Sequence, residues 1–326
     1  MVALFANAPQ IGQPSEMRCC WGRWVGFWLL ILGLPAVAAE GNRPRILTSI
    51  PPLYSWATNV AGSFADVENL LPADVGPHEY QFRPRDLRKI RAADIILLNG
   101  LGLESWFSRT ISASDPAAAR KVIEVAAGIP TNLLIHDIPA LHLEGDPAES
   151  HPDHGHGPAN PHVWLDPHFA KIAVTNLLSA LQRMDAEHAP DYARNAAQYI
   201  ERLELLDQDI RSSLAKLPKK EVITFHDAFP YFCRRYGLNL VGVIEEVPGT
   251  SPSPRYLADL SAVIRSRKVG VLFAEPQFDP RLARQLGRDL GVSVALLDTL
   301  ETGRLAPSFY EDSLRANLRV LQSSLK

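Results

Sequence analysis

Cysteine is scarce in this chain of 326 residues, which contains only three. Cys19 and Cys20 come before a short apolar run near the N-terminus, in a segment that we expect to be removed. Cys233 is then the only cysteine of the mature chain, which excludes an intrachain disulfide. Its aromatic, helical context in the sequence predicts a small buried hydrophobic residue and not a reactive thiol.

An excess of positive charge is also missing. The chain has 33 Lys and Arg residues against 36 Asp and Glu residues, a net charge of −3. No large basic field is therefore available, and we predict no nucleic-acid partner. The body of the chain also lacks an apolar run of the ~20 residues needed to cross a bilayer. Hydrophobic residues at 46% and charged residues at 21% are typical of a globular protein, and the length predicts about two domains.

The first 39 residues have the features of a secretory signal. Arg18 and Arg23 form a basic flank, residues 25–34 form a short apolar core, and small residues follow. This order predicts cleavage near Ala38 or Ala39 and export of the mature chain. A membrane anchor is the alternative, but the apolar core is short of the ~20 residues that an anchor needs.

Strand and helix patterns alternate along the rest of the chain, which favours mostly parallel sheets with helices on their faces. In the first half we expect strands at 44–50, 67–71, 94–99 and 121–125, and helices at 54–61 and 86–93. In the second half we expect strands at 221–225, 239–244, 269–274 and 293–297, and helices at 228–236, 254–266 and 280–290. The predicted fold class is therefore α/β, with two small lobes of roughly four strands each.

One long helical pattern, from 191 to 217, separates the two halves. Its apolar residues recur at steps of three and four and so share one face, and Pro218 is the first Gly or Pro to interrupt it. At 1.5 Å per residue this helix is about 40 Å long, enough to join two lobes as a stiff spine. An ordinary packing helix in a single larger domain is the alternative. We expect an N-terminal lobe at 40–190, the linking helix at 191–217 and a C-terminal lobe at 218–326.

Residues 141–161 interrupt the alternation with a polar, histidine-rich loop. The loop contains His142, His151, His154 and His156 among Gly, Pro, Asp and Glu. A short His-rich tract can bind metal loosely, whereas a loop without fixed geometry selects metals poorly. Weak metal binding and a solvated loop with no essential histidine are both open interpretations.

Three other histidines and two carboxylates mark a candidate metal site. His162 lies between two prolines, which constrain its backbone on both sides. His78 lies in the loop after the second expected strand, and His226, Glu275 and Asp298 each follow a strand of the second half. Ligands of open α/β sheets bind outside the carboxyl ends of the strands, so two facing lobes would bring these side chains to one cleft. Three imidazoles and one carboxylate suit tetrahedral zinc, whereas manganese prefers more oxygen ligands.

Four segments of the chain carry a resemblance to a known family. They contain Gly76-Pro77-His78, Asn160-Pro161-His162, Phe225-His226-Asp227 and Ala274-Glu275-Pro276, the last with Asp298 downstream. In these segments the chain resembles the periplasmic metal-binding components of zinc and manganese ABC importers, which are solute-binding proteins with a rigid linking helix. The similarity extends over nearly the whole mature chain, and the combination of motifs is specific.

The resemblance implies a set of metal ligands. Histidines at the positions of His78, His162 and His226 bind the metal in this family, and a carboxylate completes the site. Asp298 matches the family's final carboxylate and is the expected fourth ligand, and Glu275 is the alternative. If Asp298 binds the metal, Glu275 is expected to be a cleft wall or a hydrogen-bond partner of a ligand. Manganese-preferring members typically carry glutamate in place of His226, so zinc is the expected metal and manganese the alternative. The chain departs from the family at Asn160, where aspartate is common.

The expected function is capture of zinc in the periplasm and its delivery to the membrane permease of an ABC importer. We expect the chain to act as a monomer and not as an enzyme. A secreted zinc hydrolase is the alternative class, which needs an open metal position and a general base such as Glu79 or Glu275. The sequence contains no His-Glu-x-x-His motif of that class. A metal-carrying surface adhesin is a third class that the sequence leaves open.

Overall fold

The computed structural model describes residues 43–78, 80–136, 159–245 and 249–326. The expected signal segment 1–39, the candidate base Glu79 and residues 141–158 of the histidine-rich loop lie outside these ranges. The expectations for these three parts of the chain therefore stay predictions.

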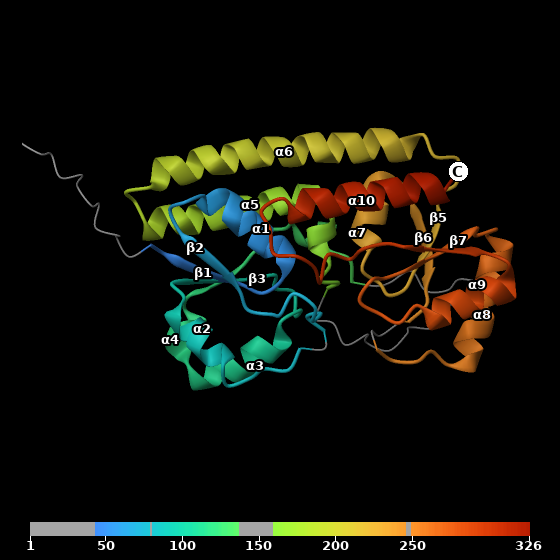
Figure 1. Ribbon diagram of the computed structural model, residues 1–326, viewed down its shortest axis with the longest axis horizontal. Coiled ribbons are helices and arrows are strands. Elements are labelled where there is room, and N and C mark those ends of the chain that lie inside the picture. The colour runs from blue at the N-terminus through green and yellow to red at the C-terminus, as the bar shows by residue number, and fades with distance from the viewer. Residues whose placement is uncertain (1–42, 79, 137–158, 246–248) are drawn as a thin grey trace, which may run out of the picture. The chain divides into compact units, whose positions relative to one another are not determined.

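The first lobe is built on a four-stranded parallel sheet (Figure 1). Its strands are β1 (Arg45–Thr48), β2 (Asp66–Asn69), β3 (Ile95–Leu98) and β4 (Val122–Glu124), in the order β2-β1-β3-β4. The helices are α1 (Pro51–Ala61), α2 (Asp86–Ala92), α3 (Ser105–Ser114) and α4 (Pro116–Ala119), followed by the 3-10 turn η1 (Thr131–Leu133). The uninterrupted apolar sequence of β3 is buried throughout, as expected for a central parallel strand that is covered on both faces.

The second lobe repeats this topology. Its parallel strands are β5 (Glu221–Thr224), β6 (Asn239–Val243), β7 (Val271–Ala274) and β8 (Ser293–Leu296), in the order β6-β5-β7-β8. Its helices are α7 (Pro230–Tyr236), α8 (Pro254–Ser266) and α9 (Arg281–Leu290). In both sheets the strand order reverses beside the first strand, between β1 and β3 and between β5 and β7. Such switch points are where open α/β sheets bind ligands.

The helix α6 (Ala189–Ala215) joins the two lobes, as predicted from its apolar periodicity. It begins and ends two residues earlier than expected, because Pro190 is tolerated in the first turn of a helix, where its missing N–H has no partner to lose. Its buried stripe consists of Tyr192, Ala196, Tyr199, Leu203, Leu206, Ile210 and Leu214. The turn η2 (Val163–Leu165) and the helix α5 (Pro167–Met184) precede it and carry the chain away from His162.

The last helix, α10 (Phe309–Ser324), was not expected from the sequence pattern. It packs against α1 and α6 and runs beside α6 in Figure 1. The segment between β8 and α10 therefore crosses from the second sheet back to helices of the first lobe. Residues 297–308, which include Asp298 and Glu301, form this crossing segment between the two lobes.

Cys233 lies buried on α7, in the core that α7 shares with α6 and the first lobe. Burial raises the pKa of its thiol to about 12, so the thiol stays protonated and behaves as the small hydrophobic residue that was predicted. None of the helices in the described ranges has the length and apolar character of a membrane span.

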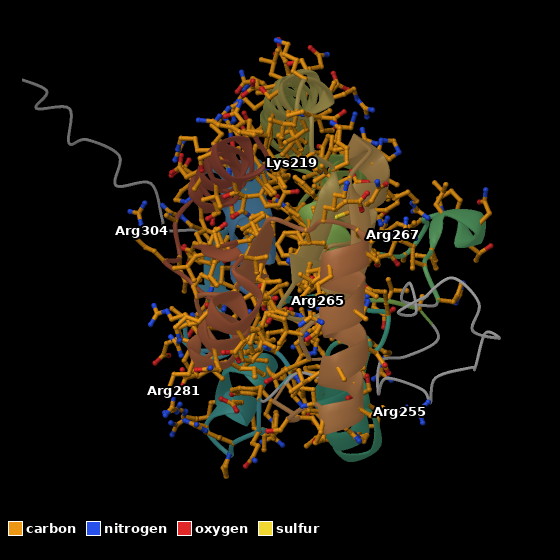
Figure 2. All side chains as sticks on the ribbon, turned by 90° about the vertical axis from the view of Figure 1, so that its right-hand side faces the viewer. Lys219, Arg255, Arg265, Arg267, Arg281 and Arg304 are labelled. Atoms are coloured by element: carbon orange, nitrogen blue, oxygen red, sulfur yellow. The ribbon has the colours of Figure 1, made fainter. Side chains whose placement is uncertain are left out.

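The amino ends of the strands of the second sheet carry a group of cations. Figure 2 labels three of them, Lys219 in the loop before β5, and Arg265 and Arg267 at the end of α8 before β7. Because β5 and β7 are neighbours, the two loops meet at one edge of the sheet. Cations are stabilised at the carbonyl end of a helix, which accounts for the two arginines. The candidate ligands lie at the opposite edge, beyond the carboxyl ends of the strands.

Candidate metal centre

Four side chains from widely separated parts of the chain meet between the lobes: His78, His162, His226 and Glu301. We call them the histidine–glutamate cluster. Each contributes one potential ligand atom, and these four atoms all lie within 4.8 Å of one another. The Nε2 atom of His162 lies 3.1 Å from that of His78 and 3.2 Å from that of His226. Glu301 Oε1 lies 3.3 Å from the Nε2 atoms of His78 and His226 and 3.4 Å from that of His162.

These separations fit a four-coordinate metal ion. A tetrahedral site with metal–ligand bonds of about 2.05 Å has edges of about 3.3 Å between its ligand atoms. Five pairs of atoms in the cluster are separated by 3.1 to 3.4 Å. Within the described residues, Glu301 Oε1 is buried and accepts no hydrogen bond, so a cation at the centre would satisfy it. The histidine–glutamate cluster is therefore a metal site of three imidazoles and one carboxylate.

His162 is fixed at the switch point of the first sheet. Asn99, which follows β3, donates a hydrogen bond from Nδ2 to the carbonyl oxygen of Pro161 at 2.9 Å. Asn160 Oδ1 accepts from the His162 backbone N–H at 3.0 Å and lies 2.9 Å from Nδ1 of the same ring. Because an amide oxygen only accepts, Nδ1 carries the proton and Nε2 presents its lone pair to the cluster.

The amide orientation of Asn160 is fixed because its nitrogen, Nδ2, also forms hydrogen bonds. Its Nδ2 donates to the backbone oxygen of Asp227 at 2.9 Å and to Asp227 Oδ2 at 2.8 Å. An aspartate at position 160 would place two carboxylates against each other in a buried setting. The amide is therefore the side chain that suits its carboxylate neighbour, which explains the departure from the family pattern noted in the sequence.

His226 is fixed at the switch point of the second sheet. It follows β5, and Glu275 follows the neighbouring strand β7. Glu275 accepts from the backbone N–H of His226 at 3.0 Å, and its Oε2 lies 2.6 Å from His226 Nδ1. The carboxylate thus holds the ring from behind with Nε2 directed at the cluster. Glu275 does not belong to the cluster, in agreement with the role of hydrogen-bond partner that was considered for it.

His78 is the accessible member of the cluster. Its side chain is 14% exposed, whereas those of His162, His226 and Glu301 are at most 1% exposed. It comes from the loop that follows β2, and it lines a small cavity of about 120 Å³ together with Asp74, Val75, Gly76, Gln277, Phe278 and Glu301. This cavity is the side from which solvent approaches the cluster.

The carboxylate of the cluster is Glu301 and not Asp298, which was predicted from the sequence. Asp298 Oδ1 accepts a hydrogen bond from the backbone N–H of Leu300 at 2.8 Å. The backbone N–H of Asp298 donates to Asn317 Oδ1, and Asn317 Nδ2 donates to the backbone oxygen of Asp298. This turn forces buried Leu300 into the left-handed region at φ 63°, at a cost of about 1–2 kcal/mol for a residue with a Cβ. The turn directs Glu301 into the cleft, so Asp298 shapes the loop that presents Glu301.

Glu301 was not predicted from the sequence, because it does not directly follow a strand as the predicted ligands of the second lobe do. Glu301 lies three residues beyond Asp298 in the same loop, and the only signal was a second acidic residue shortly before Gly303. Gly303 has φ 136°, and a Cβ there would lie 2.5 Å from the Phe309 ring, so this turn requires glycine.

The surroundings of His162 and His226 shift their pKa values in opposite directions. Burial lowers the pKa of His162 to about 3, despite its contact with Glu301. Burial alone would also lower the pKa of His226, but the neighbouring carboxylates Glu275 and Glu301 outweigh burial and raise it well above its ordinary value. Burial would raise the pKa of Glu301, but His78, His162 and His226 hold it well below its ordinary range. The cluster therefore contains an ionised carboxylate, and the raised pKa of His226 means that an incoming cation must displace a proton from that ring.

Comparison with known proteins agrees with this site. The family model described as "Zinc-uptake complex component A periplasmic", ZnuA, matches residues 46–324. The chain belongs to the ZnuA family. It is thus a metal-binding, periplasmic-type solute-binding protein, and this family is not one of enzymes, which sets aside the alternative of a zinc hydrolase.

Individual relatives share about 30% sequence identity with this chain. The chain is 30% identical over 273 residues to the zinc-binding protein AdcA of Streptococcus pyogenes serotype M3, covering 81% of this chain but only 52% of AdcA. It is 28% identical over 319 residues to the high-affinity zinc uptake system protein ZnuA of Bacillus subtilis, covering 93% of this chain and 98% of that protein. The chain thus spans about half the length of the AdcA proteins that it matches and nearly all of the Bacillus protein.

The fold is similar to that of a solved solute-binding protein. The solute-binding protein FpvC of Pseudomonas aeruginosa, solved in complex with Mn²⁺, superposes with a TM-score of 0.73 at 29% identity. The alignment covers 87% of this chain and 98% of FpvC. The predicted α/β fold, with two four-stranded parallel sheets joined by the long helix α6, is therefore confirmed.

Proposed function

We propose that this chain is a periplasmic zinc-binding protein that captures one zinc ion between its lobes and delivers it to the permease of an ABC importer. His78, His162, His226 and Glu301 are the proposed ligands. The observation that carries the proposal is the set of five ligand-atom separations of 3.1 to 3.4 Å, which matches the edges of about 3.3 Å in a tetrahedral zinc site.

Manganese is the second candidate, because FpvC was solved in complex with Mn²⁺. Three imidazoles with one carboxylate suit zinc, whereas manganese favours sites with more oxygen ligands and higher coordination numbers. Two relatives are named for zinc. These points together support zinc as the cargo of this chain.

Metal analysis of protein purified without added metal tests this proposal. We expect one zinc per chain, retained against competing Mn²⁺. Zinc at a thousandfold excess over its dissociation constant stabilises the fold by about 4 kcal/mol, so chelator should lower the thermal unfolding temperature measurably. Equal unfolding temperatures with and without chelator would contradict a bound ion, and displacement of zinc by equimolar Mn²⁺ would assign the site to manganese.

Export and delivery need their own test. Segment 1–39 is the proposed secretory signal, and the permease is the proposed partner of the zinc-loaded chain. Fractionation of cells expressing the full sequence should place a chain shortened by about 39 residues in the periplasm. Zinc transfer into vesicles that contain the permease should require this chain, and uptake at the same rate without it would contradict the delivery role.

A further inference from the structure

One short helix of the second lobe contacts the segment of the first lobe that carries His162. The helix α7 begins four residues after His226 and presents Tyr231 and Arg235 one turn apart, and Asp227 lies a further four residues upstream of Tyr231. Tyr231 and Arg235 lie on the same face of the helix because they are four residues apart, and Asp227 lies in the turn before it. All three contact residues of the first lobe that lie near His162.

The first two contacts involve Asn160. Asp227 receives both hydrogen bonds of the Asn160 amide N–H₂ group. The hydroxyl of Tyr231 donates to the backbone oxygen of Asn160 at 2.7 Å and accepts from the Ile135 N–H at 3.1 Å. Asp227, Asn160 and Tyr231 are all buried, so these hydrogen bonds are sheltered from competition with water.

The third contact is an ion pair that includes the linking helix. Arg235 Nε lies 3.0 Å from Asp166 Oδ1, at the start of α5 in the first lobe. The same guanidinium forms a two-pronged contact with Asp207 of α6, at 2.8 and 2.6 Å. The side chains of Arg235, Asp207 and Asp166 are only 17%, 13% and 6% exposed. Arg235 therefore joins the second lobe, the first lobe and α6 through one rigid group.

Asp166 transmits this contact to His162. A single 3-10 turn, η2, separates the two residues, with hydrogen bonds from Leu165 N to His162 O and from Asp166 N to Val163 O. Asp166 also caps α5 by accepting the His168 N–H at 2.8 Å. A displacement of Asp166 would move the whole turn and carry His162 with it.

The other two members of the cluster are held by other contacts. Asp298 and Asn317 fix the turn before Glu301, and Gly303 N donates to Ala73 O at 2.7 Å, which joins the loop of Glu301 to that of His78. These two residues also line the cavity through which solvent reaches the cluster. Within the described residues, the ion pairs of Arg235 lie on the side of His162 and His226 and do not include these two loops.

We propose that Arg235 is a positioning residue, which acts through Asp166 and Asp207 to keep His162 and His226 at chelating distance before the ion arrives. The pair forms a preorganised half-site, and ion exchange proceeds on the side of His78 and Glu301. This inference rests on the proposed function, because it concerns the affinity of the same site. Loss of the Arg235 contact should therefore weaken metal binding without removing any ligand.

The variant Arg235→Gln tests this role, with Arg211→Gln as a matched control. Arg211 lies 3.8 Å from the same carboxylate, Asp207, and is 53% exposed, so its substitution makes the same change of charge without breaking a bond to the first lobe. We expect Arg235→Gln to lower zinc affinity about tenfold or more, as loss of a residue that supports a metal ligand typically does. Arg211→Gln should stay within about twofold of the parent chain, the scatter of a surface substitution.

The same substitution in two backgrounds separates positioning from a general loss of stability. In His78→Ala the His162–His226 pair is still present, so Arg235→Gln should keep its full penalty on zinc affinity. In His162→Ala the residue that Arg235 positions no longer binds, and the penalty should vanish. Equal penalties in both backgrounds, or equal affinities of Arg235→Gln and Arg211→Gln, would overturn the inference.

Two controls keep the test decisive. If Arg235→Gln does not fold, as judged by thermal unfolding of the ion-free protein, Arg235→Lys takes its place, because lysine cannot contact both carboxylates as a planar fork does. Lysine is then expected to give the same pattern in the two backgrounds. Absence of zinc binding by the unmodified chain would overturn the proposed function itself, an outcome distinct from normal binding without an effect at position 235.

Discussion

The four proposed ligands form two pairs that the fold holds in different ways. His162 and His226 are buried, lie at the switch points of the two sheets, and are braced by Asn160, Glu275 and the contacts of α7. His78 and Glu301 come from loops that a backbone hydrogen bond joins, from Gly303 to Ala73, and they line a small cavity on whose side His78 is 14% exposed while Glu301 stays buried. The difference indicates how a site can select a metal and still exchange it: one pair fixes the geometry, and the other admits the ion.

Removing a histidine from each pair is the strongest test of this contrast. We expect His226→Ala to lower zinc affinity by more than about a hundredfold, beyond the range seen when only a supporting residue is lost. His78→Ala should have a smaller effect, because water from the adjacent cavity can take the vacated position at a site that is 14% exposed. Isothermal titration with a competing chelator measures both, and a larger loss for His78→Ala would contradict the assignment of the pairs.

The acidic ligand can be tested with two isosteric substitutions. Glu301→Gln removes the charge that faces the three imidazoles, and we expect a loss of about a hundredfold, at the upper end of the effects of supporting residues. Asp298→Asn keeps the oxygen that accepts the Leu300 N–H, since asparagine forms the same turn, and should cost about threefold or less. The reverse order in a zinc titration would return the role to Asp298.

Glu275→Gln tests the support behind the braced pair. The amide removes the carboxylate that lies 2.6 Å from His226 Nδ1, and loss of such a partner typically costs ten- to a hundredfold in metal affinity. The variant Glu311→Gln is a suitable control, because Glu311 is also a buried glutamate but contacts Tyr199 and Arg202 instead. Equal zinc affinities of the two variants would show that Glu275 does not support the site.

The pH dependence of binding should report His226 and not His162. Below its raised pKa, His226 is an imidazolium ion with both ring nitrogens protonated. Zinc must then displace the proton from Nε2, so the zinc affinity falls as pH falls. We expect a loss of at least about tenfold per pH unit from about pH 7.5 to 5.5, as for release of one proton. His162, with a pKa of about 3, stays neutral throughout, with its one proton on Nδ1.

Glu275→Gln should shift this pH profile. It removes the first of the two carboxylates that raise the pKa of His226, while burial continues to lower it. The fall in affinity should therefore begin at a lower pH than in the parent chain. A flat profile from about pH 7.5 to 5.5 in the parent chain would contradict a raised pKa of His226.

Much of the fold was predictable from the sequence because local patterns agreed with the final packing. Period-two and apolar runs marked the strands, and an uninterrupted helical period marked α6. The rule that ligands lie beyond the carboxyl ends of parallel strands placed His226 and Glu275 correctly at neighbouring strand ends. The motifs that resemble the family then brought His78 and His162 into the same hypothesis, and the structure places both in the cluster.

Glu301 could not be found in the same way, because its position depends on a turn and on packing over long sequence separations. Leu300 takes a left-handed backbone that leucine rarely adopts, and no local pattern indicates it. The course of the loop is set by α10, where Asn317 holds the backbone of Asp298. The ion-pair contacts of Arg235 likewise join three elements that only the tertiary fold brings together.

Diffraction from crystals of protein purified without added metal, collected on both sides of the zinc absorption edge, tests the central claim most directly. We expect one anomalous peak per chain, strong above the edge and weak below it, at about 2.0–2.1 Å from Nε2 of His78, His162 and His226 and from Oε1 of Glu301. A peak of the same height on both sides of the zinc edge, or an ion coordinated by Asp298 instead of Glu301, would contradict the proposed site.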